Sequence, residues 1–322
     1  MKTLIIPCLG RSMVDGVPKY LARHPLGTLA VRYAIDSINF NDIDRIIVSI
    51  LNEDNQKYHA RDIVQNELSD LGNVEFILFN KRTNGPAETV YEMIKRADVK
   101  GSILIKDVDS RLEVSPTAEG NFLVGWDLSK FETQVHFLRN KSFIVLNEQF
   151  QVLDIVEKSF RSNVISVGLY GFCNVEDFIF SYEKLKKDFS GDIVLYISHV
   201  ISYLIGFCGH VFKQYETSIY EEWGNDKSWQ HLQKIYGTYF VNIDNLFLDR
   251  EKFFWKLSLL SKRGAKIIFL TNNSKEGMID VIDYLKGLNF NPEGIIFNCN
   301  YSNVKKIISS KENVLQLIAD LE

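Results

Sequence analysis

Short apolar runs alternate with amphipathic stretches over the first hundred residues, and this alternation restricts the fold more than any other feature of the sequence. The apolar runs have the length and composition of strands: Leu4–Pro7, Arg45–Ile50, Val74–Phe79 and Ser102–Lys106. The stretches between them carry apolar residues at i, i+3 and i+4 and are predicted to be helices: Leu26–Ile38, Gln56–Leu68 and Ala87–Ala97. Strands and helices that alternate in this way predict parallel β-α-β units, with both faces of the sheet covered. Ligands of such sheets bind beyond the carboxyl ends of the strands.

The pattern changes twice farther along the chain. Four shorter apolar runs indicate an antiparallel portion of the sheet: Phe122–Trp126, Ser142–Leu146, Val152–Val156 and Ile165–Phe172. Two predicted helices follow, Val175–Lys187 and Ile193–Ile205. A second alternation then begins: strands Tyr239–Ile243, Lys266–Leu270 and Gly294–Phe297, with helices Arg250–Lys262 and Lys275–Lys286. We therefore predict an α/β protein, with a Rossmann-like mixed sheet over residues 1–236 and a smaller α/β domain over residues 237–322.

Composition argues against several classes of function. The net charge is -4, from 37 basic and 41 acidic residues, so nothing points to a nucleic-acid partner or an anionic membrane surface. The N-terminus lacks the pattern of a secretion signal, and no apolar run approaches the ~20 residues of a membrane span, which predicts a cytoplasmic location. Neither the histidines nor the cysteines show metal-ligand spacing. We expect all four cysteines to be buried: Cys8, Cys173, Cys208 and Cys299.

The first predicted strand runs into a glycine-bearing loop, Leu9-Gly10-Arg11-Ser12, and Lys19 follows just ahead of a helical pattern. A loop of this kind presents backbone N–H groups and one cation to phosphates. We therefore predict that Leu9, Gly10 and Arg11 bind a nucleotide and that Lys19 supplies the cation.

This opening resembles that of the sugar nucleotidyltransferases, which read roughly I-I-P-A-A-G-x-G-x-R followed by P-K. The matching residues here are Ile5–Ser12, then Pro18 and Lys19. Enzymes of that family have a GT-A-like fold, attach a nucleoside monophosphate from an NTP to a phosphorylated sugar or alcohol, and release pyrophosphate. The resemblance implies that Lys19 is catalytic. Val14 stands where the family has a catalytic arginine, and Arg11 is the predicted substitute.

Two carboxylates follow the fourth predicted strand, in the run Ile103–Asp109. Mg²⁺ prefers oxygen ligands and often takes only one or two from the protein, so Asp107 and Asp109 are candidate ligands. In the resembled family an aspartate directly after this strand binds the metal, which implies that role for Asp107. Two aspartates in a turn are as often simple turn formers, and this alternative stays open.

A third element, Thr83–Thr89, reads as a turn followed by a helix start, with glycine and proline as breakers. It also resembles the family's G-x-A segment, whose backbone lies against the nucleobase. The resemblance implies nucleotide binding by Asn84, Gly85 and Ala87. Only small side chains let a base approach the backbone so closely.

The resemblance extends to an acceptor site. Glu157-Lys158 and the later Gly168 are similar to the family's E-K followed by G-x-Y-x-F, which implies that Glu157 binds sugar hydroxyls and Lys158 the acceptor phosphate. Gly168 belongs to the same implied site. Glu222, in the run Tyr220–Asn225, stands where the family has its other metal ligand.

The C-terminal region resembles a second family. Phe240–Asn245 and Phe269–Asn273 are similar to the first two motifs of haloacid-dehalogenase-like (HAD-like) phosphatases. Asn242 occupies the place of the nucleophilic aspartate, while Asp244 and Thr271 are retained. An amide cannot form an acyl-phosphate, so we predict a HAD-like domain without phosphatase activity, used for packing, dimerisation or regulation.

Three functions follow from these observations. The first is an Mg²⁺-dependent nucleotidyltransferase for a sugar phosphate or similar phosphorylated acceptor, with a role in capsule or surface-polysaccharide synthesis as the resemblance implies. The second is a non-catalytic descendant that binds a nucleotide or a partner enzyme, which Val14, Glu222 and Asn242 favour. The third is a nucleotide-sugar glycosyltransferase that uses Asp107 and Asp109.

Overall fold

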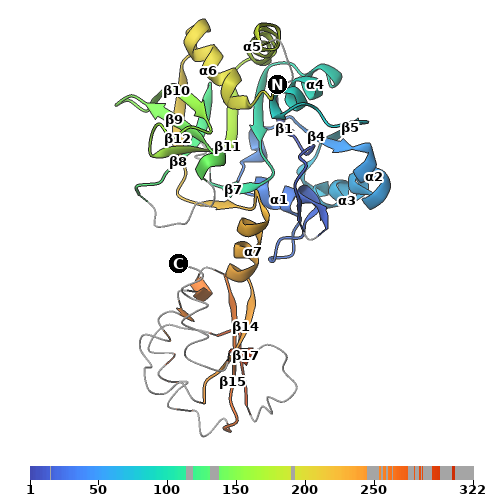
Figure 1. The fold of residues 1–322 in the computed structure, drawn as a ribbon. Helices are drawn as coiled ribbons and strands as arrows, with labels where there is room; N and C mark the ends of the chain where they lie inside the picture. The colour runs from blue at the N-terminus through green and yellow to red at the C-terminus, as the bar shows by residue number, and fades with distance from the viewer. Residues whose placement is uncertain are drawn as a thin grey trace. The chain divides into compact units, whose positions relative to one another are not determined.

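The computed structural model describes residues 1–14, 16–113, 119–130, 138–189 and 193–244, and then 254, 257–258, 260–262, 264–274, 279, 283, 285, 292–297 and 307–308. The chain divides into two compact units, Met1–Ser228 and Trp229–Glu322 (Figure 1). This division falls inside helix α7 (Asp226–Ile235), a few residues before the boundary predicted at residue 236. The reason for the difference is that α7, which we did not predict, spans the junction.

The N-terminal unit contains a nine-stranded mixed sheet in the order β5-β4-β1-β6-β11-β8-β12-β10-β9. Its first half is parallel: β1 (Lys2–Ile6), β4 (Arg45–Leu51), β5 (Val74–Phe79) and β6 (Ser102–Lys106). Its second half is mostly antiparallel: β8 (Phe122–Asp127), β9 (Ser142–Leu146), β10 (Gln151–Glu157), β11 (Val164–Phe172) and β12 (Phe212–Glu216). The mixed α/β sheet is confirmed for this unit, although β12 was not predicted.

Helices cover the sheet, and the central strands β1, β4 and β6 are buried on both faces. One face packs against α4 (Pro86–Arg96), α5 (Val175–Asp188) and α6 (Ile197–Cys208), in a core that includes Ile5 of β1. The neighbours of Ile5 on either side, Leu4 and Ile6, are also fully buried and point to the opposite face, because side chains alternate along a strand. Burial on both faces explains why these strands read as continuous apolar runs.

Three helix predictions were wrong in their bounds. The stretch Leu26–Ile38 is α-helical only in α1 (Ala30–Ile35). Gln56–Leu68 is not one helix, because His59 has φ 54° and separates α2 (Asn52–Tyr58) from α3 (Ala60–Glu67). The predicted helix from Ile193 begins only at Ile197, because Tyr196 is extended and the carbonyl of Leu195 accepts a hydrogen bond from Ala87 N.

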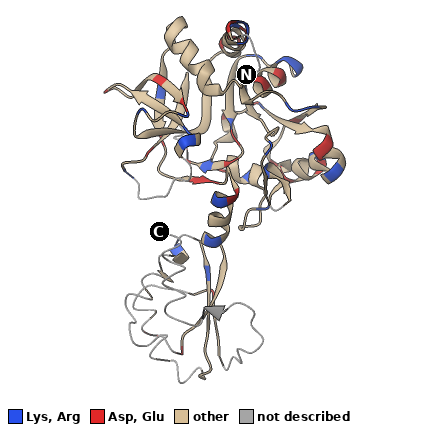
Figure 2. Cartoon of the chain, in the orientation of Figure 1, with Lys and Arg blue, Asp and Glu red and all other residues tan. Residues whose placement is uncertain are grey.

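The cysteine prediction held for one residue only. Cys8 is buried, whereas Cys173 and Cys208 are exposed, because both lie just past the end of an element or at its last residue. Cys299 lies outside the described residues. Basic and acidic side chains are interspersed along the described part of the chain (Figure 2). None of the described helices is long and apolar enough to cross a membrane.

The C-terminal unit contains a four-stranded parallel sheet in the order β16-β15-β14-β17. Its strands are β14 (Thr238–Asn242), β15 (Lys266–Leu270), β16 (Gly294–Ile296) and β17 (Ile307–Ile308). Val241, Ile267 and Phe269 are fully buried in its core. The helices predicted over residues 250–262 and 275–286 lie largely outside the described residues.

A buried histidine makes the stability of the N-terminal unit depend on pH. His24 is 1% exposed and stacks on Tyr33 at 3.8 Å between ring centroids. Burial, and then the charge of Arg111, lowers the pKa of His24 to about 4. Because the unfolded chain has a histidine pKa near 6.5, it binds protons more readily than the folded chain between those two values. Stability is therefore complete above about pH 6.5 and decreases as the pH falls toward 4.

We expect the free energy of unfolding of the wild type to decrease by ~2 kcal/mol more than that of a His24→Gln variant when the pH is lowered from 7.5 to 5. Urea titrations at the two pH values measure it. The exposed His59→Asn variant is the control, because asparagine tolerates the left-handed backbone found there. Equal pH dependence in His24→Gln and wild type would contradict the assignment.

Candidate active site

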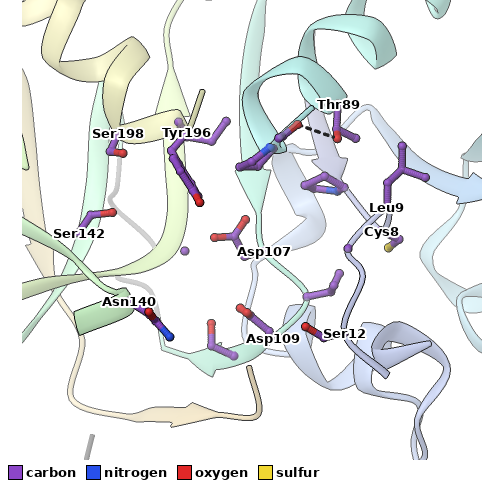
Figure 3. A pocket seen from close by; sticks show the side chains of 18 of the residues that line it. Cys8, Leu9, Ser12, Thr89, Asp107, Asp109, Asn140, Ser142, Tyr196 and Ser198 are labelled. Carbon is purple, nitrogen blue, oxygen red and sulfur yellow. Dashed lines mark hydrogen bonds between the residues drawn. The ribbon is translucent and has the colours of Figure 1, made fainter. Parts of the chain in front are cut away.

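A cavity of about 700 Å³ lies at the carboxyl ends of β1 and β6. Ten of the thirteen residues predicted for the N-terminal site line it: Leu9, Gly10, Arg11, Lys19, Asn84, Gly85, Asp107, Asp109, Glu157 and Gly168. The other three, Ala87, Lys158 and Glu222, are absent from its lining. Figure 3 shows Asp107 and Asp109 between Leu9 and Ser12 on one side and Ser142 and Tyr196 on the other.

The loop after β1 forms one wall of the cavity. Its start is held to the neighbouring strand, because Cys8 N donates to Ser49 Oγ at 2.8 Å. The loop then enters a short hairpin, β2 (Met13–Val14) with β3 (Val17–Pro18), in which Val14 is 2% exposed. Val14, which stands where the resembled family has an arginine, is therefore a packing residue.

Lys19 is anchored toward the carboxylates. Its side chain is 13% exposed, and Nζ donates to Gly224 O at 2.8 Å and lies 3.5 Å from Asp109 Oδ2. The ion pair joins the loop after β1 to the end of β6. A lysine held in this way presents its charge to a ligand without having to be ordered first.

A buried lysine shapes the turn that carries the two aspartates. Lys106 is fully buried, and Nζ donates to Asp107 O at 2.6 Å and to Ser110 O at 2.8 Å. Gly168, with φ +84°, lies against the first carboxylate: a Cβ there would be 2.8 Å from Asp107 Oδ2. The structure thus explains why a glycine is required at 168.

The two aspartates differ in their electrostatic surroundings. Desolvation, and then the neighbouring Asp109, raises the pKa of Asp107 to about 7. Desolvation acts in the same direction on Asp109, but the charges of Lys19, Lys141 and Lys106 hold its pKa below the usual value. Asp107 therefore holds a proton more readily than Asp109 does.

This donor set fits Mg²⁺, which commonly takes one or two carboxylates and completes its shell with phosphate oxygens and water. Asp107 and Asp109 both line the cavity. No group of three or more His, Cys, Asp or Glu side chains is placed to hold a metal among the described residues. Two carboxylates and a bound nucleotide would therefore have to supply the ligands.

Glu222 was predicted to be a metal ligand in the site, but it is not part of the lining of the cavity. It lies in β13 (Tyr220–Glu222), which pairs with β7 (Ser110–Leu112), and its Oε2 accepts hydrogen bonds from Lys141 Nζ and from Tyr220 Oη at 2.9 Å. Its Oε1 is buried without a hydrogen-bond partner among the described residues. The ammonium group of Lys141 thus compensates the charge of this carboxylate.

Hydroxyl groups surround Glu157 on the far wall of the cavity. Glu157 Oε2 accepts from Ser142 Oγ and from Ser198 Oγ, the latter at 2.6 Å. Ser166, Tyr170 and Tyr196 add further hydroxyls to the lining. Lys158 has φ 54°, and its Nζ is bonded to Tyr196 Oη and lies 4.1 Å from the centroid of that ring.

The segment that contains Gly85 and Ala87 packs against another part of the chain. Gly85 has φ +123°, and a Cβ there would lie 2.8 Å from Leu195 O. Ala87 is fully buried, and its N–H donates to the same carbonyl at 3.2 Å. Small side chains are required here because the carbonyl of Leu195 lies so close, a reason that differs from the one predicted.

Two cationic residues of the lining were missed in the sequence. Arg82 follows β5, and Lys141 precedes β9. Arg82 could have been found, because it lies just past the carboxyl end of a predicted parallel strand. No local pattern marked Lys141, since its place in the cavity depends on the pairing of β9 with β10.

In the C-terminal unit the three predicted residues come together at the carboxyl ends of β14 and β15. Asp244 accepts hydrogen bonds from Thr271 Oγ1, from Asn272 N at 2.8 Å and from Asn273 Nδ2 at 3.2 Å. Asn242 Oδ1 accepts from Asp244 N at 2.9 Å. The carboxylate of Asp244 thus organises the loop after β15.

No protein-family model matches the chain, and no curated protein matches it. Solved structures do. A nucleoside-diphosphate-sugar pyrophosphorylase from Vibrio cholerae RC9 is similar with a TM-score of 0.57 and 19% identity, over 72% of this chain and 99% of that one. The inositol-1-phosphate CTP transferase from T. maritima has a TM-score of 0.55 and 18% identity, over 71% of this chain and 91% of that one. A putative glucose-1-phosphate thymidylyltransferase from Bacillus anthracis has a TM-score of 0.56 and 15% identity, over 72% of this chain and 94% of that one.

At 19% identity or less, these likenesses show the fold alone. The shared part has the length of the N-terminal unit, since residues 1–228 are about 71% of the 322-residue chain. The chain therefore has the mixed α/β fold of sugar nucleotidyltransferases, as the sequence resemblance implied.

Proposed function

We propose that this chain transfers a nucleoside monophosphate from an NTP to a phosphorylated sugar or similar alcohol and releases pyrophosphate. The observation that carries the proposal is the composition of the cavity's lining. It combines the glycine-bearing loop after β1, Lys19, the two carboxylates and several hydroxyl groups around Glu157. These are the three kinds of group that an NTP, a metal ion and a polyhydroxy acceptor need.

The reaction is an in-line displacement at the α-phosphorus. An oxygen of the acceptor phosphate forms the new P–O bond, and the bond from the α-phosphorus to the β,γ-pyrophosphate breaks. Lys19 offsets the negative charge that develops on the transferred phosphoryl group, while Arg11 and Arg82 add positive charge on the same wall, where Val14 cannot. Glu157 accepts hydrogen bonds from acceptor hydroxyls and so orients the attacking group.

Mg²⁺ held by Asp107 and Asp109 would supply Lewis-acid stabilisation of the phosphates. Glu222 is not included in this set, because its Oε2 is already bonded to Lys141.

A screen of the four common NTPs against a panel of sugar and polyol phosphates, with pyrophosphate release as the readout, tests the proposal. Release that requires one NTP, one acceptor and Mg²⁺ together supports it. Nucleotide binding by calorimetry without any release supports the second candidate, a non-catalytic nucleotide-binding protein, which the buried Val14 and the Glu222–Lys141 pair favour.

We further propose that the C-terminal unit is HAD-like and has no phosphatase activity. Its parallel sheet and the junction of Asp244 with Thr271 support the likeness, and Asn242 is the reason for inactivity. We expect no phosphate release above background from p-nitrophenyl phosphate or sugar phosphates at saturating Mg²⁺, and no difference between wild type and Asp244→Asn. Hydrolysis that copurifies with the protein and disappears in Asp244→Asn would show that the unit uses another nucleophile.

A further inference from the structure

We propose that the ammonium group of Lys141 binds the acceptor's phosphate, in the role that the sequence resemblance assigns to Lys158. The inference rests on the proposed function, since it concerns the acceptor half of the same cavity. Lys141 precedes Ser142, the first residue of β9, and lines the cavity, whereas Lys158 is not part of the lining.

Lys141 and Lys158 are joined by a backbone hydrogen bond, but their side chains make different contacts. Lys158 N donates to Lys141 O at 3.0 Å, next to the pairing of Glu157 with Ser142 across β10 and β9. The Lys158 side chain is bonded to Tyr196 Oη and lies over that ring. Of the two lysines, Lys141 is the one that belongs to the lining of the cavity.

Lys141 is held rigidly and has donor capacity left. Nζ donates to Tyr220 Oη at 2.7 Å and to Glu222 Oε2, and its side chain is 19% exposed. An ammonium group has three N–H donors, so these two contacts leave the third to a ligand in the cavity. Because the group is already positioned, binding an anion there needs little ordering of the side chain.

The position also fits the geometry of the acceptor. Lys141 is close enough to Asp109 for its charge to act on that carboxylate, which marks the metal and α-phosphate end of the cavity. The adjacent Ser142 donates to Glu157, which marks the hydroxyl-binding end. The acceptor's phosphate must lie between these ends, because one of its oxygens attacks the α-phosphorus. Lys141 adjoins both ends, since it directly precedes Ser142 and its charge acts on Asp109.

Binding of inorganic phosphate, measured by calorimetry without divalent ions, tests this placement. All variants are made in a Lys19→Met background, so that the loop after β1 contributes less to the signal. We expect Lys141→Met to weaken phosphate binding at least tenfold, Lys141→Arg to recover most of it, and the exposed Lys213→Met to leave it within twofold. Unchanged affinity in Lys141→Met, or a larger loss in Lys158→Met, would overturn the proposal.

A double variant keeps the test decisive if Lys141→Met does not fold. Removal of Lys141 leaves the Glu222 carboxylate, 8% exposed, without its cation, which is costly for a buried charge. If Lys141→Met does not fold, Lys141→Met/Glu222→Gln removes both charges, and the same tenfold loss is expected.

Transfer assays separate this inference from the proposed function. With a functional NTP and acceptor, Lys141→Met in the otherwise wild-type chain should raise the acceptor KM about tenfold and leave the NTP KM within twofold. Equal changes in both would contradict the acceptor role. If no variant, wild type included, transfers a nucleotide, the proposed function fails, and the phosphate titration still decides whether Lys141 is an anion site.

Discussion

Replacing Asp107 by asparagine is expected to lower divalent-dependent nucleotidyl transfer about 1,000-fold, equivalent to ~4 kcal/mol of transition-state stabilisation. The variant loses the carboxylate that lies against Gly168, and with it the charge that would hold a cation near the α-phosphate in the proposed site. Pyrophosphate release at saturating NTP and acceptor, titrated with Mg²⁺, measures the effect.

The same variant should be as stable as the wild type or more stable. Asp107 is desolvated beside Asp109, a like charge, so the amide removes a repulsion and is nearly isosteric with the carboxylate. Thermal melting in the absence of metal provides the check, and Asp62→Asn, at an exposed position in α3, is the matched control. Turnover close to that of the wild type would remove Asp107 from the proposed metal site.

Replacing Lys19 by methionine is expected to lower kcat/KM about 100-fold, or ~2.7 kcal/mol, with most of the loss in kcat. The lysine is already held by Gly224 O and by Asp109, so its charge is in place when charge develops on the transferred phosphoryl group. Steady-state kinetics with varied NTP, together with calorimetry of NTP binding, separates the loss in rate from the loss in affinity.

The exposed Lys187→Met variant, on α5, controls for the loss of one positive charge. Unchanged NTP affinity together with an unchanged rate in Lys19→Met would show that the loop after β1 does not serve a nucleotide.

Local patterns in the sequence were sufficient for the parallel half of the sheet and for its ligand edge. β5 and β6 have the predicted bounds, because their apolar runs, Phe76–Phe79 and Ile103–Ile105, mark strands without reference to their pairing partners. Asp107 directly follows such a strand, so its place at the carboxyl edge follows from strand direction alone. The glycine-bearing loop after β1 was located by the same argument, and Lys19 lies across from Asp109 as expected for two neighbouring parallel strands.

Contacts between distant parts of the chain decided the other features of the site. Lys141 and Glu222 are 81 positions apart and meet only because β13 pairs with β7 beside the aspartate turn. The carbonyl of Leu195 lies against Gly85, and the backbone is extended at Tyr196, where a helix was predicted. No local periodicity encodes such pairs, since each partner is an ordinary polar or small residue in its own sequence context. The sequence by itself determined the parallel strands of the N-terminal unit and the edge of the sheet where the cavity lies, whereas tertiary packing determined which cation compensates which carboxylate in the cavity.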